Sequence, residues 1–511
     1  MARYKQIDMS PRLLAVDLSR QILPGSFEFA LSHLIDRLNL SAFDSRFRND
    51  AVGAPAYPPA LLLKIVLLAY SKGITHSRDI EAACGENVVF MAISGDSHPH
   101  FTTIAHFIAT LSEPIADVFA QVLTVCDREG LIGRQMFAID GVKLPSNASK
   151  AKSGTRADFT REAAKIRAQV AKMIERHRGC DQSTGSDPCP GNNQARHIER
   201  LTRQAERIEQ WLEQHPNDRH GAKNSVRQSN RTDNESAKIA TEKGVIQGYT
   251  AVAAVDAKHQ IVVAAQAHGV GQEQELLLPM LDALGPQRSA HTLINTDAGY
   301  YSKRNVHALD QRGVKACIPD PNYRSRDARY AGQQAHKAKP DALWDKRKAP
   351  KHLTLFKPKD FQVAADLSHC ICPAGKRLYR SGHHRNLNGF ATADFAGAKR
   401  DCGPCALRAR CLRKPESTPT RQVAIFLRKV VFEQQLEQAV ARMKQMVDSA
   451  QGHELIAQRF ATVEPVFGNV RFNKALNRFT LRGQAKVDGQ WKLCCLVHNI
   501  EKLANNGYAR E

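Results

Sequence analysis

Three acidic residues stand in sequence contexts that suit a site for divalent metal ions and a phosphate. Asp140 lies inside the apolar run 136–143, Asp297 ends the apolar run 292–296, and Glu464 follows a long helical pattern. Two Mg²⁺ ions about 3.5 to 4 Å apart need shared carboxylates to hold them against a phosphate, and hard oxygen ligands on rigid elements meet that need. Each residue alone is more often a turn former or a helix cap. Only the three together predict a two-metal nuclease site.

A second group of candidate ligands is the cysteine segment, residues 370–411. It contains five of the twelve cysteines, namely Cys370, Cys372, Cys402, Cys405 and Cys411. Clustering of this kind in a reducing compartment favours metal binding over disulfides. Reduced structural thiols are the alternative.

The charge of the chain indicates a polyanionic partner. The 511 residues carry 73 Lys and Arg against 51 Asp and Glu, a formal net charge of +22, and the excess is spread over several segments. Nucleic acid is the simplest partner. A membrane surface is the competing polyanion, but no run of about 18 uncharged apolar residues occurs, and no signal peptide follows the N-terminus. We therefore expect a soluble, cytoplasmic protein with reduced thiols.

The first 130 residues read as helical and form a candidate DNA-binding domain. Helices are expected at residues 58–70, where prolines open an apolar stretch, at 76–84, and at 102–111 with Thr102 or Thr103 as the cap. A helical domain that only packs against the rest of the protein is an equally good interpretation.

The next part of the chain alternates strand and helix patterns. Residues 149–178 carry nine Lys and Arg against three Asp and Glu, and a second helical stripe follows at 195–215. This predicts a basic helical hairpin inserted after the first strand. Its charge fits either a DNA-facing surface or an ordinary solvated helix face. The later elements are expected as strands at 248–256, 259–265, 292–296 and 314–318, helices at 273–284 and 302–311, and a two-residue turn at 257–258.

This order of elements predicts an α/β, RNase H-like core with a mixed five-stranded sheet. The other parts would be an all-α N-terminal domain, the inserted hairpin and a small Cys-rich insertion. Residues 321–360 carry eleven Lys and Arg against four Asp and Glu, interleaved with aromatics, which suits phosphate contact and base stacking or a solvated loop. A helix is expected at 421–450. The predicted domains are 1–130, the core parts 131–148 and 236–320, the hairpin 149–235, the basic and Cys-rich insertion 321–420, and the C-terminal core 421–511.

With these residues in view, nearly the whole chain resembles the DDE-type transposases of bacterial insertion sequences, in the group conventionally numbered eleven eighty-two. The resemblance is carried by the order of several short motifs rather than by any one of them. They are Pro55-Ala56-Tyr57-Pro58-Pro59, Ala138-Ile139-Asp140-Gly141, Gly248-Tyr249-Thr250-Ala251-Val252, Thr296-Asp297-Ala298-Gly299-Tyr300, Val463-Glu464-Pro465-Val466-Phe467-Gly468 and His498-Asn499-Ile500-Glu501.

The resemblance implies that Asp140, Asp297 and Glu464 are the catalytic ligands of two Mg²⁺ or Mn²⁺ ions. It also implies a zinc ribbon or knuckle in which Cys372, Cys402, Cys405 and Cys411 bind a structural Zn²⁺, with Cys370, His369, His383 and His384 as substitutes. Lys143, Arg471 and Lys474 are candidate DNA contacts.

The chain departs from the pattern of related transposases near Glu464. Those proteins carry a Tyr seven residues before the Glu, an Arg four residues before it and a Lys seven residues after it. Here the positions hold Ala457, Phe460 with Arg459 beside it, and Arg471. A hairpin route of excision therefore cannot be inferred from these residues.

The function implied is DNA transposition. The enzyme would bind the terminal inverted repeats, cleave the ends and join the 3′-hydroxyls to target DNA, acting as a homodimer that pairs two ends. Both steps are in-line phosphoryl transfers that one site can serve. The alternatives are another RNase H-like nuclease, such as a junction resolvase, and a transposase-derived DNA-binding protein without catalysis.

Overall fold

The structure is a computed structural model and describes residues 16–44, 55–182, 192–221, 225–241, 244–285, 287–332, 355–381, 385–387, 390–426 and 432–509. The chain divides into two compact units, one of residues 1–321 and 443–511 and the other of residues 322–442. Each unit is described by itself. The first contains the mixed sheet and the helices around it, and the second contains the cysteine segment.

The sheet of the first unit has the strand order β10-β9-β1-β7, and β8 and β6 both pair with β7. Strand β7 pairs antiparallel with β1, and β8 pairs antiparallel with β7, so β8 runs in the same direction as β1. Strands β9 and β10 run parallel to β1. The five expected strands are present, and this is an RNase H-like arrangement. A sixth strand, β6, was not expected; it pairs with the first residues of β7. The strands are β1 Met136–Pro145, β6 Ala237–Thr241, β7 Gly244–Asp256, β8 Val262–His268, β9 Leu293–Thr296 and β10 Ala316–Cys317.

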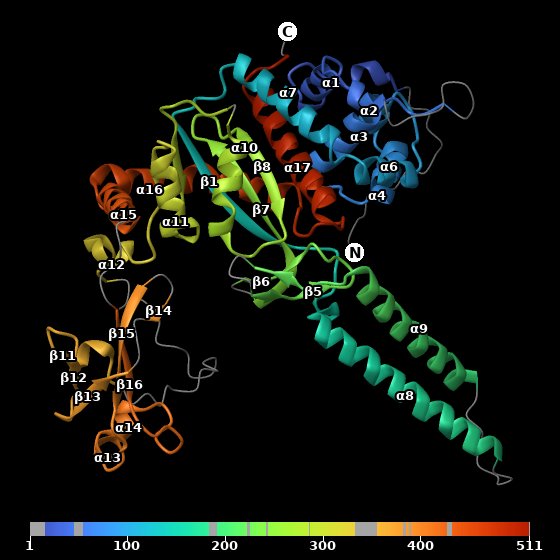
Figure 1. Ribbon diagram of the computed structural model, residues 1–511. Coiled ribbons are helices and arrows are strands. Elements are labelled where there is room, and N and C mark those ends of the chain that lie inside the picture. The colour runs from blue at the N-terminus through green and yellow to red at the C-terminus, as the bar shows by residue number, and fades with distance from the viewer. Residues whose placement is uncertain are drawn as a thin grey trace, which may run out of the picture. The chain divides into compact units, whose positions relative to one another are not determined.

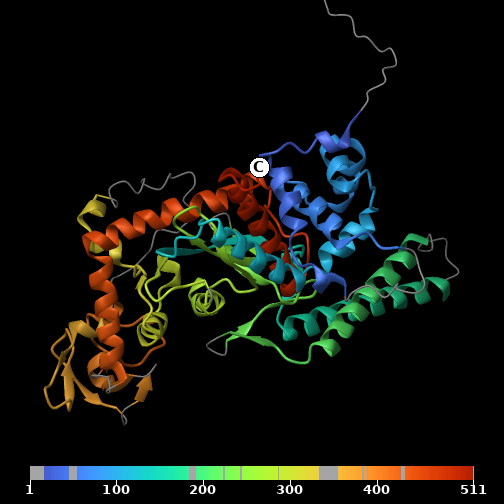
Figure 2. The same ribbon diagram turned by 90° about the horizontal axis from the view of Figure 1, so that it is seen from above.

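Helices cover both faces of this sheet (Figures 1 and 2), which explains why β7 is buried almost throughout rather than on alternate residues. Helices α10 (Leu277–Ala283) and α11 (Lys303–Gln311) lie on one face, and α16 (Ala450–Gly468) and α17 (Gln484–Asn505) lie on the other. Helix α11 begins after its cap Ser302, whose side chain accepts a hydrogen bond from the backbone of Asn305.

The N-terminal helices do not have a core of their own. Their buried residues join those of the sheet and of α17 in one continuous hydrophobic cluster, and Gln490 of α17 donates a hydrogen bond to the Tyr70 hydroxyl. The expected helix at 58–70 is confirmed as α3. The cap of α6 is His100, not Thr102 or Thr103. The helices are α1 Phe27–Ile35, α2 Ser41–Asp44, α3 Pro59–Ser71, α4 Ser77–Glu86, α5 Val88–Ser94, α6 Phe101–Ala109 and α7 Pro114–Arg128.

In the described part of the chain, no single helix is long and apolar enough to cross a membrane. The bent pair α6 and α7 passes the same test of length and composition when the two are taken together.

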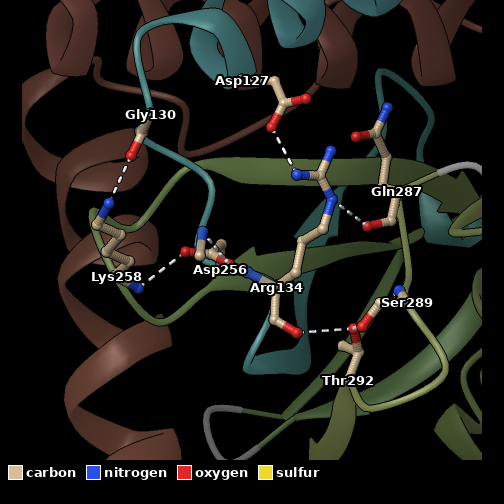
Figure 3. Close-up of polar contacts among 9 residues, drawn as sticks. Asp127, Gly130, Arg134, Asp256, Lys258, Gln287, Ser289 and Thr292 are labelled. Atoms are coloured by element: carbon tan, nitrogen blue, oxygen red, sulfur yellow. Dashed lines mark hydrogen bonds and ion pairs between the residues drawn. The ribbon is translucent and has the colours of Figure 1, made fainter.

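A polar joint fixes the start of β1 against its neighbours (Figure 3). The carboxylate of Asp256 at the end of β7 accepts hydrogen bonds from the backbone of Gly133 and Arg134, at 3.0 and 2.8 Å. The Arg134 guanidinium pairs with Asp127 of α7 at 2.6 Å, and the Arg134 carbonyl accepts from Thr292 just before β9. These contacts fix β1, β7 and β9 relative to one another at this end of the sheet. The relative positions of residues further along the three strands follow from this.

The inserted hairpin is confirmed as two helices, α8 (Arg156–Gln182) and α9 (Asn192–Gln214), which extend from the sheet side by side (Figure 1). Its apolar contacts alternate in steps of four and three, which is the spacing of coiled-coil seams. The contacts are Phe159, Ala163, Ile166 and Val170 on α8 against Ile198, Leu201, Ala205, Ile208 and Leu212 on α9. The base is closed by β2 (Ser153–Gly154), which pairs with β5 (Ser229–Asn230), and by the short pair β3 (Arg219–His220) and β4 (Val226–Arg227).

The second unit is built on an antiparallel sheet in the order β11-β12-β13-β15-β14, with β16 on β15. The helix expected at 421–450 is partly wrong, because its first residues form β16 and helix α15 starts only at Phe432. The described elements are α12 Tyr323–Arg326, β11 Gln362–Val363, β12 His369–Ile371, β13 Arg377–Arg380, β14 Arg385–Leu387, β15 Phe390–Gly397, α13 Lys399–Cys402, α14 Arg408–Cys411, β16 Gln422–Phe426 and α15 Phe432–Val447.

Candidate active site

Asp140 and Asp297 lie next to each other on the two central parallel strands. In the register of β1 and β9, Ile139 is opposite Thr296, so each aspartate is the next residue along its own strand. The side chain of Asp140 is 16% exposed. Two carboxylates from separate parts of the sequence are thus brought to one place by strand pairing.

The pKa of Asp140 is raised to about 6, chiefly because the side chain is buried; Arg459 opposes this rise, and the negative charge of Asp297 contributes to it. The Arg459 guanidinium lies 2.6 Å from Oδ2 of Asp140, and the Gly141 backbone donates to Oδ1 at 2.8 Å. A carboxylate whose ionisation is disfavoured by burial and by a second carboxylate gains from a cation placed between the two. Asp140 and Asp297 therefore fit a divalent metal ion.

Asp297 also has a local structural role. Its Oδ1 accepts a hydrogen bond from the Gly299 backbone at 2.9 Å, so it caps the short 3₁₀ turn Ala298–Tyr300. Capping uses one oxygen of the carboxylate. Asp297 therefore acts as a cap, as expected for an aspartate at a strand end, and it also lies beside Asp140.

Glu464 is on α16 and is exposed. Arg459, five residues earlier on the same helix, faces Asp140, and five residues turn a helix by about 140° relative to that face. Among the residues that the structure describes, no three His, Cys, Asp or Glu side chains form a group that could hold a metal ion. The fold thus brings Asp140 and Asp297 together but does not gather Glu464 into one group with them.

The three predicted DNA contacts have different surroundings. Lys474 is 5% exposed and its ammonium pairs with Glu501 and the Ser71 carbonyl, so it joins α17 to α3 and is not a phosphate contact in this fold; that prediction is corrected. Lys143 is 28% exposed and pairs with Glu273 at 3.0 Å. Arg471 stacks on Phe472, a residue that is 77% exposed, and in the described part of the chain its buried Nε atom has no hydrogen-bond partner.

Two residues near the aspartates are not among the predicted catalytic ligands. The sequence shows Arg459 only as an arginine one place away from the expected position. Glu273, which pairs with Lys143 of β1, falls in the helix expected at 273–284, but that helix begins at Leu277. The sequence carried no signal that would place Glu273 beside β1.

The four predicted zinc ligands gather around one cavity of about 30 Å³ in the second unit. Cys372, Cys402, Cys405 and Cys411 line it. Burial raises the pKa of the Cys411 thiol, and the other three thiols add to this effect. In contrast, Cys370 packs into the apolar core of the unit, and His383 and His384 lie outside the described residues. The described thiols share a cavity but are not disposed to hold a metal ion as they stand.

Two protein families match the chain. Residues 371–504 match the family described as Transposase DDE domain, and residues 16–110 match the family described as Transposase domain (DUF772). The first match includes Glu464 and the four cysteines of the cavity, while Asp140 and Asp297 lie outside both. No curated protein and no solved structure matches the chain.

These matches, together with the RNase H-like sheet, make the protein a metal-dependent enzyme that acts on DNA. Within that class, the two family matches indicate a DDE-type transposase of an insertion sequence.

Proposed function

We propose that the enzyme cleaves the two ends of its own insertion sequence and joins the freed 3′-hydroxyls to target DNA. The observation that carries this proposal is the pair Asp140 and Asp297, placed at one level of β1 and β9, with the pKa of Asp140 raised by burial and by its neighbour. Transfer of a phosphoryl group needs concentrated positive charge near the phosphate. The adjacent carboxylates of Asp140 and Asp297, both half-buried, can hold such charge.

Asp140 and Asp297 would hold two Mg²⁺ or Mn²⁺ ions, with Glu464 as the third ligand. When bound, two such ions supply an activated water and stabilise charge on the attacking and leaving oxygens. Arg459 orients Asp140 through their hydrogen bond. The same planar guanidinium is suited to a DNA phosphate, since arginine binds carboxylates and phosphates with similar geometry.

DNA would bind to a basic flank of the hairpin. Arg196, Arg200, Arg203 and Arg207 recur on one side of α9, are exposed, and line a groove of about 550 Å³ together with Lys152 and Arg231. They span about 16 Å at the helical rise of 1.5 Å per residue, a length comparable with about five phosphates of one strand at about 3.4 Å each. The only acidic residue in the lining is Glu199, which pairs with Arg203.

A second basic groove lies near the site. It measures about 830 Å³ and reaches Gln272, the residue before Glu273, and its charged lining is entirely basic: Lys150, Arg219, Arg227 and Lys238. Lys150 and Lys152 belong to one short turn, so the two grooves begin on the same element. We propose that duplex DNA follows them and that a homodimer pairs two ends. Much of the basic segment 321–360 lies outside the described residues, and its role in binding stays a proposal.

We also propose that the four cysteines of the second unit bind one structural Zn²⁺. Tetrahedral thiolate sites of this composition hold small domains together. Their common cavity supports the proposal, although the thiols would have to move closer to bind.

The catalytic proposal is tested by the variants Asp140→Ala, Asp297→Ala and Glu464→Ala. Each should abolish cleavage of a DNA fragment that carries the element's end and leave binding of that fragment close to wild type, because affinity comes mostly from Lys and Arg on phosphates. Asp282→Ala is the matched control, since Asp282 is exposed and pairs with Arg312. Cleavage at a near wild-type rate by any of the three would remove that residue from the site.

A further inference from the structure

Glu273 has an environment that an ordinary surface glutamate lacks. It begins the 3₁₀ turn Glu273–Glu275 after β8, and its side chain is 15% exposed. Its carboxylate lies 3.0 Å from the ammonium of Lys143, three residues along β1 from Asp140. A loop residue is therefore directed toward the strand that carries the first catalytic aspartate.

The carboxylates of Glu273 and Asp297 both lie close to the backbone of Gly299. A Cβ atom added to Gly299 would collide with Oε2 of Glu273 and would lie 3.1 Å from Oδ1 of Asp297. Only glycine leaves room for the two acidic side chains to approach here. Asp140, Asp297 and Glu273 are thus linked through neighbouring residues of β1, β9 and this turn.

The hydroxyl of Tyr300 provides an independent observation. Tyr300 is fully buried, and its hydroxyl has no hydrogen-bond partner among the residues that the structure describes. Besides burial, the charges that raise its pKa come from Asp140, Glu273 and Asp297. A Cβ atom on Gly141 would lie 3.1 Å from this hydroxyl, so it points to the strand at Asp140. An unpaired buried hydroxyl costs free energy and calls for a ligand or water.

We propose that Glu273 is an additional metal-ligating carboxylate of the Asp140 and Asp297 site. This inference rests on the proposed function, because it assigns a further ligand to the same site. In the structure, two of these acidic residues form ion pairs with basic residues: Glu273 with Lys143, and Asp140 with Arg459. Among the described residues the three carboxylates do not yet form a group that could hold a metal ion, so binding would require Glu273 to leave Lys143 and turn to the cation. The buried Tyr300 hydroxyl would then donate to an oxygen brought in with the ion.

The alternative role for Glu273 is to neutralise Lys143 and nothing more. The two roles differ in what happens when both charges are removed together. If Glu273 is only the counter-ion of Lys143, its loss has no effect on metal binding once Lys143 is also removed. If Glu273 is a metal ligand, its loss weakens metal binding whether or not Lys143 is present.

The experiment is a titration of the full-length, metal-free protein with Mn²⁺, followed by calorimetry and by the electron paramagnetic resonance of free Mn²⁺. Glu273→Gln and the double variant Lys143→Met with Glu273→Gln should both bind Mn²⁺ about tenfold or more weakly than wild type, since losses of 10–100-fold are usual even for outer-shell partners of a metal. Glu275→Gln is the matched control; Glu275 is in the same turn and pairs with Arg227 at 2.9 Å, and it should bind as wild type does.

Asp140→Asn separates this proposal from the one on which it rests. If Asp140→Asn binds Mn²⁺ as wild type does, the metal site is wrongly placed and the role of Glu273 is overturned with it. If Asp140→Asn loses binding while the double variant binds as wild type does, only the role of Glu273 is overturned. Should Glu273→Gln fail to fold, as judged by circular dichroism, the double variant carries the test, because it leaves no unpaired charge.

Discussion

Asp140 has a partner that the sequence cannot name, because it pairs with Arg459 from 319 residues away; Asp297, in contrast, caps the turn that directly follows it. A carboxylate that is only 16% exposed needs such a partner, because an unpaired buried charge costs several kcal/mol. At the scale of the residue, the chemistry of the site therefore depends on basic residues as much as on the three acidic ones.

His498 gives a prediction for stability at this scale. It is buried in α17, where Nε2 faces the Gln260 carbonyl at 2.9 Å and Nδ1 faces the amide of Asn469 at 3.1 Å. Burial lowers its pKa from the usual 6.5 to about 4. Between these two values the unfolded chain binds a proton and the folded chain does not, so stability falls as the pH falls through this window.

The shift corresponds to about 3 kcal/mol lost between pH 6.5 and pH 4, at 1.36 kcal/mol per pKa unit. The variant His498→Gln cannot bind this proton. Urea unfolding of both proteins at a series of pH values should show the stability advantage of wild type shrinking by about that amount as the pH is lowered. A difference that stays constant over the window would show that His498 titrates normally in the folded protein.

At the scale of the element, the hairpin separates its charges. One side of α9 carries the four arginines of the groove, whereas Glu206, Glu209 and Glu213 lie on another side, where Glu209 pairs with Arg167 of α8. An ordinary solvated helix mixes its charges to form i to i+4 pairs. A row of arginines on one side of a helix instead creates a positive electrostatic potential there, which attracts a polyanion.

Replacing Arg196, Arg200, Arg203 and Arg207 by Gln should weaken end binding and reduce the magnitude of the slope of log affinity against log salt by about 3.6, since each of the four lost phosphate contacts removes about 0.9. The control replaces four basic residues of α8 that do not line the groove, Arg161, Lys165, Lys172 and Arg176. Binding is measured by fluorescence anisotropy at several salt concentrations. Equal losses in the two variants would mean that net charge, not this row, governs binding.

The cysteine cavity gives the second prediction at this scale. Purified protein should contain about one zinc per chain, and Cys372→Ser should lose it and unfold the second unit at a lower temperature, because binding free energy of a structural zinc is folding free energy. Cys370→Ala should keep its zinc, since Cys370 packs in the apolar core and not in the cavity. Absence of zinc from wild-type protein, with the melting temperature unchanged by a chelator, would refute the site.

At the scale of the molecule, the N-terminal helices and the sheet share one core, so the first unit unfolds and functions as a whole. The hairpin has a separate small core of its own. The two ends of the hairpin are adjacent, because Arg156 bonds to Asp218 and to the His215 carbonyl. It can therefore be removed without stretching the chain.

Deleting residues 155–215 and rejoining the ends should leave a folded protein that binds its DNA ends more weakly and with a shallower salt dependence. Folding is checked by circular dichroism and binding by the same anisotropy titration as above. A truncated protein that folds and binds with unchanged affinity and salt slope would make the hairpin a structural insertion and not a DNA surface.

The sequence by itself determined the elements that local patterns encode. The apolar stretch after Pro59 became α3, the stripes at 149–178 and 195–215 became the hairpin, and the carboxylates at 140 and 297 were identified from short strand-like contexts. These predictions rest on periodicity and capping, which act within a few residues. The same local reasoning missed β6 and extended a helix over β16, because short strands are stabilised by their partners in the sheet rather than by their own residues.

Only the tertiary structure decided which side chains meet. Register between β1 and β9 placed Asp140 beside Asp297, and packing of α16 on the sheet brought Arg459 to Asp140. A turn after β8 brought Glu273 to Lys143, and burial removed Lys474 from the candidate DNA contacts. Such contacts join residues tens to hundreds of positions apart, and their existence depends on the packing of the whole chain, which no local pattern contains.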